Sequence, residues 1–375
     1  MRKIDIFNHI YPPAYYTRLM RIAPDYQDIG KRMRGIPMLA DLDVRFRVMD
    51  AFDEYEQVLS LPTPPIENIV RGADALELAR AANDGMAELV AQTSATFSRR
   101  SSRRCAFDDP DAAVREAIRA IDDLGARGIQ MFTNVHGTPI SAPQFLPIFE
   151  TLAARDLPIW LHPYRGADMP DFKAEARSEF EIWWTFGWPY ETSAAMARLV
   201  FAGYFDRFPD LKIITHHMGA MAPYFAGRVG PGWDQLGART SDGRSRCGVA
   251  RLEEAPARLL QDVLRRHGAV RRLRRHGLRP RASSAPTTCC LRPTRRSIRK
   301  KVRCTSARRS RSSIACRYRP TSARRIYWRN AVRLLKAPGL TRRSIGLLLG
   351  RAHRAPLERQ VPAANRNPYQ SSASS

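Results

Sequence analysis

Short apolar runs alternate with amphipathic segments along the first 235 residues. Apolar and β-branched residues predict strands at 3–8, 57–61, 129–133, 157–161 and 211–215. Apolar residues at helical spacing predict helices at 74–90, 110–124, 144–155 and 191–205. Strands that alternate with such helices are typical of parallel β/α units. The chain has 375 residues, which is enough for one large barrel.

Two carboxylates stand where predicted helices begin. Asp74 is placed to cap the helix at 74–90, and Asp109 is placed to cap the next one, with Pro110 as its first residue. Between these helices, residues 93–106 include an Arg- and Ser-rich stretch with neither helical nor strand periodicity. We therefore expect irregular structure at 93–106.

Histidines follow three of the predicted strands. His9 follows the first strand, His162 ends the strand at 157–161, and His216 with His217 follows the strand at 211–215. The carboxyl ends of parallel barrel strands meet at one face, where barrel enzymes carry their catalytic groups. Imidazole both binds divalent metals and transfers protons near neutral pH. A packed pair of loop histidines explains 216–217 equally well, but three strand-end histidines favour a metal or proton-transfer site.

Charge divides the chain into two unlike parts. The net charge is +26, yet residues 265–375 hold 31 of the 62 Lys and Arg residues and one of the 36 acids, Glu358. The last aspartate is Asp262. A basic run such as 271–276 would attract phosphates, so a nucleic-acid binder is one alternative. The segment has few aromatic residues for base stacking and matches no binding module, so we expect no specific nucleic-acid partner.

The cysteine spacing and the length of the apolar runs argue against zinc modules, secreted disulfide-rich proteins and membrane-spanning proteins. The spacing of Cys105, Cys289, Cys290, Cys304 and Cys316 matches neither a zinc module nor a secreted disulfide framework. No apolar run reaches the length of a membrane span, and a strand pattern starts at residue 3. These features predict a cytoplasmic protein without a signal peptide or a membrane partner.

Three motifs carry a resemblance to a known family. They are Ile4–His9 with Pro12, Trp160–Pro163, and Phe208–Lys212 continuing through His217, Gly219, Pro223 and Gly227–Arg228. In this order they resemble the amidohydrolase-related family that includes aminocarboxymuconate semialdehyde decarboxylase and γ-resorcylate decarboxylase. Residues 329–331 with Leu334 and Leu335 resemble the family's final helix. The resemblance covers most of 1–235 and about 325–336.

The resemblance implies a distorted (β/α)8 TIM barrel over residues 1–264 and one divalent metal, zinc or manganese. It also implies a carboxy-lyase or hydrolase acting on a small carboxylated aromatic or enoic compound. His9 and His162 fall on metal-ligand positions, and His217 falls on the position of a catalytic proton-transfer group. Phe7 falls on the family's first ligand position and cannot bind a metal, while the role of His216 stays open. The family is commonly dimeric, so a homodimer is a further expectation.

The family also needs an aspartate after strand eight, which the chain lacks beyond Asp262. We assigned GC-rich codons to residues 282–303 and read them one base out of register. The resulting amino-acid sequence is like the missing segment and includes its aspartate. We therefore interpret 265–322 as a frame-shifted segment without packed structure, which leaves the barrel unclosed. We expect a barrel helix at 323–337 and a disordered tail at 338–375. An inactive, degenerate family member is the alternative to an active enzyme.

Overall fold

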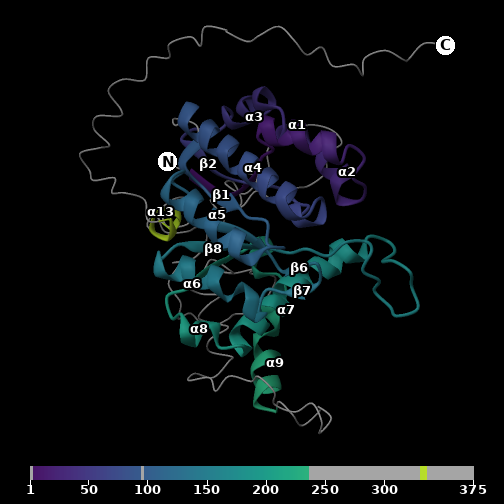
Figure 1. Ribbon diagram of the computed structural model, residues 1–375. Coiled ribbons are helices and arrows are strands. Elements are labelled where there is room, and N and C mark those ends of the chain that lie inside the picture. Colours follow the sequence, from purple (N-terminus) through teal and green to yellow (C-terminus); the bar gives the residue numbers. More distant parts are fainter. Residues whose placement is uncertain (1–2, 94–96, 236–329, 336–375) are drawn as a thin grey trace, which may run out of the picture. The chain divides into compact units, whose positions relative to one another are not determined.

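The computed structural model describes residues 3–93, 97–235 and 330–335 (Figure 1). Seven parallel strands form its sheets, and they are β1 Lys3–His9, β2 Tyr55–Ser60, β3 Phe97–Ser101, β4 Arg103–Arg104, β5 Ile129–Phe132, β8 Pro158–His162 and β9 Lys212–Thr215. One sheet has the order β1-β2-β3 and the other β4-β5-β8-β9. Parallel strands that neighbour one another in sequence order are the arrangement of a β/α barrel.

Helices connect these strands, as parallel pairing requires. The α-helices are α1 Pro13–Ile22, α2 Ile29–Arg34, α3 Leu42–Met49, α4 Gly72–Gln92, α5 Pro110–Asp122, α6 Leu146–Ala154, α7 Trp188–Phe201, α8 Tyr204–Arg207, α9 Ala222–Asp234 and α13 Asn330–Leu334. Short turns are η1 Pro37–Leu39, η2 Ile66–Asn68, η3 Pro143–Phe145, the π-helical η4 Trp183–Gly187 and η5 His216–Gly219. A small antiparallel pair, β6 Asn134–Val135 with β7 Thr138–Pro139, follows β5. No described helix combines the length and the apolar character needed to cross a membrane.

Of the two helix caps predicted from the sequence, one is correct and the other is wrong. The carboxylate of Asp109 accepts the amide hydrogen of Ala112 at 2.9 Å, so the predicted cap of α5 is confirmed. Helix α4 instead begins at Gly72, two residues before Asp74, which lies in its first turn. The amide of Gly72 donates to Asp108 at 2.9 Å, so a carboxylate distant in sequence satisfies this helix start.

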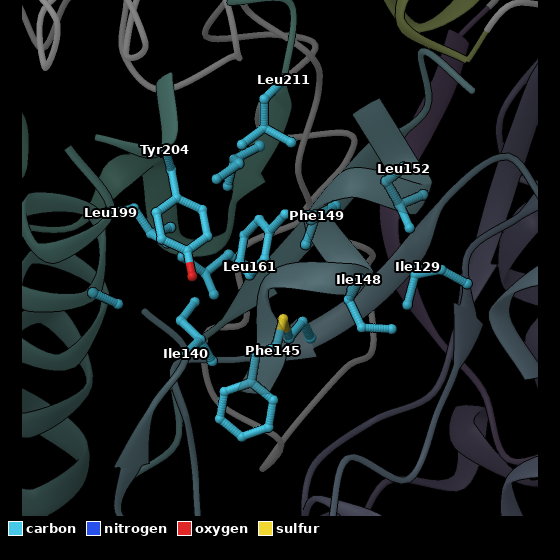
Figure 2. Packing of buried hydrophobic residues seen from close by; sticks show 14 of the residues in the cluster. Ile129, Ile140, Phe145, Ile148, Phe149, Leu152, Leu161, Leu199, Tyr204 and Leu211 are labelled. Carbon is cyan, nitrogen blue, oxygen red and sulfur yellow. The ribbon is translucent and has the colours of Figure 1, made fainter. Parts of the chain in front are cut away.

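Apolar side chains pack between β5, β8 and β9 and the helices that cover them. Figure 2 shows Leu161 of β8 beside Phe149 of α6, with Leu199 of α7 and Tyr204 of α8 nearby. The rings of Phe149 and Tyr204 meet edge to face at 4.8 Å between centroids. A second cluster packs α1 and α4 on residues of β2 and its following loop. These two cores hold the strand ends in fixed positions.

Helix α13 docks on the inner residues of four strands. Ala331, Leu334 and Leu335 are buried in a cluster that is completed by Ile4, Ile6, Val58, Trp160 and Ile214. The indole of Trp160 also donates to the backbone oxygen of Ile6 at 3.0 Å, which links β8 to β1. Helix α13 thus lies within the range 323–337 for which we predicted a barrel helix.

The expectation of irregular structure at 93–106 is wrong for residues 97–101 and 103–104, which form strands. Strand β3 pairs with β2, and β4 pairs with β5, both in parallel. A parallel ladder is built from backbone amides and carbonyls, so a side-chain pattern without strand periodicity does not prevent it. The segments 265–322 and 338–375, for which we predicted frame-shifted and disordered chain, lie outside the described residues.

Candidate functional site

Four histidines meet at the carboxyl ends of β1, β8 and β9. The ring centroids of His9 and His162 are 5.7 Å apart, and those of His162 and His217 are 5.4 Å apart. His216 lies among them, 4.6 Å from His162 and 5.6 Å from His9. The structure therefore brings together all three histidines singled out from the sequence and adds a fourth.

An unusual turn lets two adjacent histidines reach the same cluster. His217 and Met218 adopt left-handed backbone angles, with φ of 55° and 59°. Such a conformation costs about 1–3 kcal/mol per non-glycine residue and is concentrated at functional sites. His216 is fully buried, whereas His217 is half-buried. The pair thus provides one interior and one accessible imidazole.

Backbone carbonyls set the tautomer of two of these rings. The Nδ1 atom of His162 lies 2.7 Å from the Pro163 oxygen, and that of His216 lies 3.0 Å from the Leu161 oxygen. A carbonyl oxygen only accepts hydrogen bonds, so Nδ1 carries the hydrogen in both rings. The lone pair then resides on Nε2, the atom through which each ring can bind a metal or accept a proton.

The environment of His162 favours its neutral form. Burial lowers the pKa of His162 well below its usual value, and the neighbouring histidines lower it further, His216 first among them. The hydrogen bond to the Pro163 carbonyl opposes this shift. His162 is thus suited to act as a ligand or a base, because a neutral ring keeps its lone pair.

Aromatic rings form the walls around the histidines. The Trp188 ring lies 5.2 Å from His162 and 5.6 Å from His217, with an angle of 31° between the latter pair. Phe132 contacts His162 from the end of β5, with centroids 5.2 Å apart. Trp188 begins α7 directly after the π-helical turn η4, a feature often found at functional sites. Flat apolar walls of this kind suit a planar substrate.

Charged side chains from the loop after β8 and from α7 lie near Trp188. The Trp188 indole donates to the Arg165 backbone oxygen at 3.1 Å. The Arg165 guanidinium lies 3.8 Å from Glu191 and 3.5 Å from Asp171. Burial raises the pKa of Glu191, although Arg165 and hydrogen bonds from Asn134 and Thr133 oppose the shift. These contacts join the loop after β8 to the first turn of α7, where Trp188 lies.

The described residues do not complete a metal site. Across 3–93, 97–235 and 330–335, no group of three or more His, Cys, Asp or Glu side chains is arranged to hold a metal ion. Phe7 lies at the ligand position implied by the resemblance and contacts His216 edge-on at 5.2 Å. Imidazole chemistry fits a divalent metal, but only His9 and His162 stand at the ligand positions implied by the resemblance, fewer than the three protein ligands usual for catalytic zinc.

Sequence reasoning left the role of His216 open and did not single out Trp188. The place of His216 directly after a strand was a usable signal. His217 joins the same cluster through left-handed backbone angles at 217–218, which no residue type in the sequence indicates. Trp188 reaches the cluster only because the loop after β8 brings α7 back over the strand ends.

Parallel β/α units with imidazoles at the carboxyl strand ends define a class of barrel enzymes with histidine-based sites. Within that class, an amidohydrolase family model matches residues 5–266, and the chain belongs to this family. Solved structures with the same fold include 5-carboxyvanillate decarboxylase from Sphingomonas paucimobilis, which is 20% identical with a TM-score of 0.66 and coverage of 90% of this chain and 99% of that one. The predicted amidohydrolase-type barrel is thus confirmed.

Curated relatives are decarboxylases. γ-Resorcylate decarboxylase of Polaromonas sp. strain JS666 is 34% identical over 217 residues, or 55% of this chain and 62% of the relative. The 2-amino-3-carboxymuconate-6-semialdehyde decarboxylase of Dictyostelium discoideum is 31% identical over 197 residues, or 52% of each chain. This chain thus spans about half to three fifths of the length of these relatives. A dihydroxybenzoic acid decarboxylase structure from Polaromonas sp. JS666, with bound manganese and 2-nitroresorcinol, is 22% identical, with a TM-score of 0.64 and coverage of 89% of this chain and 97% of that one.

Proposed function

We propose that this chain is a non-oxidative decarboxylase, a carboxy-lyase, for a small aromatic carboxylate. The observation that carries the proposal is the four-histidine cluster at the ends of β1, β8 and β9, walled by Trp188 and Phe132. The curated relatives favour decarboxylation over hydrolysis, because their names describe loss of a carboxyl group.

The proposed reaction replaces a carboxylate by a hydrogen atom. The protonated His217 ring donates its proton to the ring carbon that bears the carboxylate. The bond between that carbon and the carboxylate then breaks, carbon dioxide leaves, and the bonding electrons restore the aromatic ring. Solvent returns a proton to His217, which its half-buried position allows. Trp188 packs on the substrate ring and holds the reacting carbon near His217.

A divalent metal, zinc or manganese, belongs to the proposal with His9 and His162 as its ligands. Each ring offers one imidazole nitrogen, and such a metal would supply positive charge beside the substrate's oxygen atoms. Because no three donor side chains of the described residues are arranged to hold one ion, we expect the metal to bind weakly. The proton transfer is therefore assigned to imidazole alone.

The second candidate is an inactive member of the family. Phe7 stands at a ligand position, and no aspartate follows Asp262. The phenylalanine at position 7 and the missing aspartate each remove a metal ligand that the resemblance implies. This candidate predicts a folded cluster without turnover, so activity measurements separate it from the first.

The test uses the full chain with 2,6-dihydroxybenzoate and 5-carboxyvanillate, with and without added zinc or manganese. Carbon dioxide release and product formation are measured, and in D2O the product should carry deuterium at the carbon that lost the carboxylate. His217→Gln should abolish turnover, whereas His136→Gln, at an exposed position on the turn between β6 and β7, should leave it unchanged. No turnover by the wild-type chain in any condition would support the inactive candidate. Light scattering of the same samples tests the expected homodimer.

A further inference from the structure

The register of β1 and β2 places a hydroxyl group beside His9. His9 ends β1, Ser60 ends β2, and the two residues are direct partners in the parallel ladder. Ser60 is 1% exposed. Its Oγ lies 2.8 Å from the backbone oxygen of Asn8 and 2.9 Å from Nδ1 of His9. One hydroxyl therefore contacts both the backbone and the ring at the end of β1.

Hydrogen-bond chemistry assigns the direction of these two contacts. The Asn8 oxygen can only accept, and a serine hydroxyl has one hydrogen to donate. If that hydrogen pointed at His9, the Ser60 and Asn8 oxygens would face each other at 2.8 Å without a hydrogen between them. Both contacts are satisfied when Ser60 donates to Asn8 and accepts from Nδ1–H of His9. His9 then has the same tautomer as His162 and His216, with its lone pair on Nε2.

The three rings differ in what fixes this tautomer. For His162 and His216 the acceptor is a main-chain carbonyl, which no side-chain substitution removes. For His9 it is the hydroxyl of Ser60, which a substitution can remove. The tautomer of His9 can therefore be tested by mutation at a residue outside the histidine cluster.

The backbone of His9 has a separate support. The buried Arg45 guanidinium donates to the His9 carbonyl oxygen and the Gln57 side chain, and at 3.2 Å to the Met38 oxygen. Burial lowers the pKa of Arg45 to about 10, so the group stays charged at neutral pH. Arg45 thus holds the main chain at the end of β1, which leaves Ser60 to orient the ring.

We propose that Ser60 is a positioning residue that holds His9 in the Nδ1–H tautomer and so keeps the Nε2 lone pair available to the histidine cluster. Groups that orient a functional imidazole through its second nitrogen typically change activity or metal affinity by 10- to 100-fold when they are removed. The catalytic consequence rests on the proposed decarboxylase function, whereas the tautomer itself does not.

The experiment measures histidine tautomers by NMR in the full chain labelled with 15N at histidine. The two ring nitrogens have distinct shifts when one carries hydrogen and the other a lone pair, and a His9→Gln spectrum identifies the His9 signals. Ser60→Ala is compared with Ser60→Thr, which keeps a hydroxyl. The control is Thr192→Val, which removes a buried hydroxyl bonded to the Trp188 oxygen rather than to a histidine.

We expect Ser60→Ala to convert His9 from a single Nδ1–H tautomer to a mixture, while Thr192→Val leaves the His9 signals unchanged. Ser60→Thr should restore the single tautomer; if the extra methyl group prevents folding, the comparison of Ser60→Ala with Thr192→Val still decides. Unchanged His9 signals in a folded Ser60→Ala chain would overturn the proposal. If the wild-type chain decarboxylates, kcat of Ser60→Ala should fall about 10-fold with little change in KM. A wild-type chain without turnover would refute the proposed function and leave the tautomer result to judge Ser60.

Discussion

Replacing Phe7 by histidine should strengthen the weak metal site that we propose at His9 and His162. Phe7 and His9 are two positions apart on β1, and both contact the His216 ring, at 5.2 and 5.6 Å. An imidazole at position 7 would therefore enter the same cluster as His9 and His162. The variant would have three candidate protein ligands, the number found in typical catalytic zinc sites.

The expected gain follows from the affinity of complete sites. Four-ligand structural zinc sites bind with about 10–16 kcal/mol, which corresponds to about 3 kcal/mol for each ligand. One additional imidazole should therefore lower the Kd for zinc roughly 100-fold. Loss of the edge-on contact between Phe7 and His216 works against folding but not directly against zinc binding.

Zinc affinity is measured by competition with a chromophoric chelator, and bound zinc by elemental analysis after dialysis. Phe7→Leu is the matched control, because it removes the aromatic ring without adding a donor. An equal Kd for Phe7→His and Phe7→Leu would refute the placement of residue 7 in the cluster. Stoichiometric zinc in the dialysed wild-type chain would show that its ligand set is larger than the described residues provide.

Three further variants test the electrostatics and packing that support the site. Burial raises the pKa of Glu191, so its contribution to stability is largest below its ordinary pKa of 4.5 and is lost as pH rises through the folded-state pKa. The free energy of unfolding of Glu191→Gln, measured in urea, should therefore rise relative to that of the wild type between pH 4 and pH 7. A difference that does not change with pH would contradict this. The buried carboxylate of Glu116 accepts from Asn83 at 2.7 Å and from Arg119 at 2.8 Å, so Glu116→Ala should lower the free energy of unfolding by about 3 kcal/mol without changing kcat. Leu335→Ala should cost about 2–5 kcal/mol and more than Val332→Ala, which is only partly buried; equal losses in thermal melts would show that α13 does not dock as described.

The strand pattern predicted the fold better than the helix boundaries. Strands 129–133, 157–161 and 211–215 match β5, β8 and β9 to within one residue at each end, because buried parallel strands are continuous apolar runs. Asp109 is a correct cap, since its acceptor and the helix start are adjacent in sequence. The start of α4 depends on Asp108, 36 residues away, and no local pattern contains that contact.

The site shows the same division between local and distant causes. His9, His162 and His217 could be singled out because strand ends are readable in the sequence and barrels gather them. The turn that follows His216 uses left-handed angles at His217 and Met218, and neither residue is a glycine that would mark such a turn. The roles of His9, His162 and His217 stay predictions, and the experiments above test them.

Three boundaries coincide near residue 265 and lead to a last prediction. The family match ends at residue 266, the last aspartate is Asp262, and the basic stretch of 31 Lys and Arg residues begins at 265. Family-like sequence returns where α13 packs on β1 and β8. A frame shift between these points explains all three boundaries, because a shifted frame changes composition abruptly and leaves the sequence on both sides intact.

The coding DNA for residues 265–325 should therefore contain, one base out of register, a segment with an aspartate like that expected after strand eight. A chain repaired at both points should bind zinc more tightly than the natural one, since it regains a carboxylate ligand. Absence of such a segment from every frame would refute this explanation, and the basic stretch would then need a role of its own.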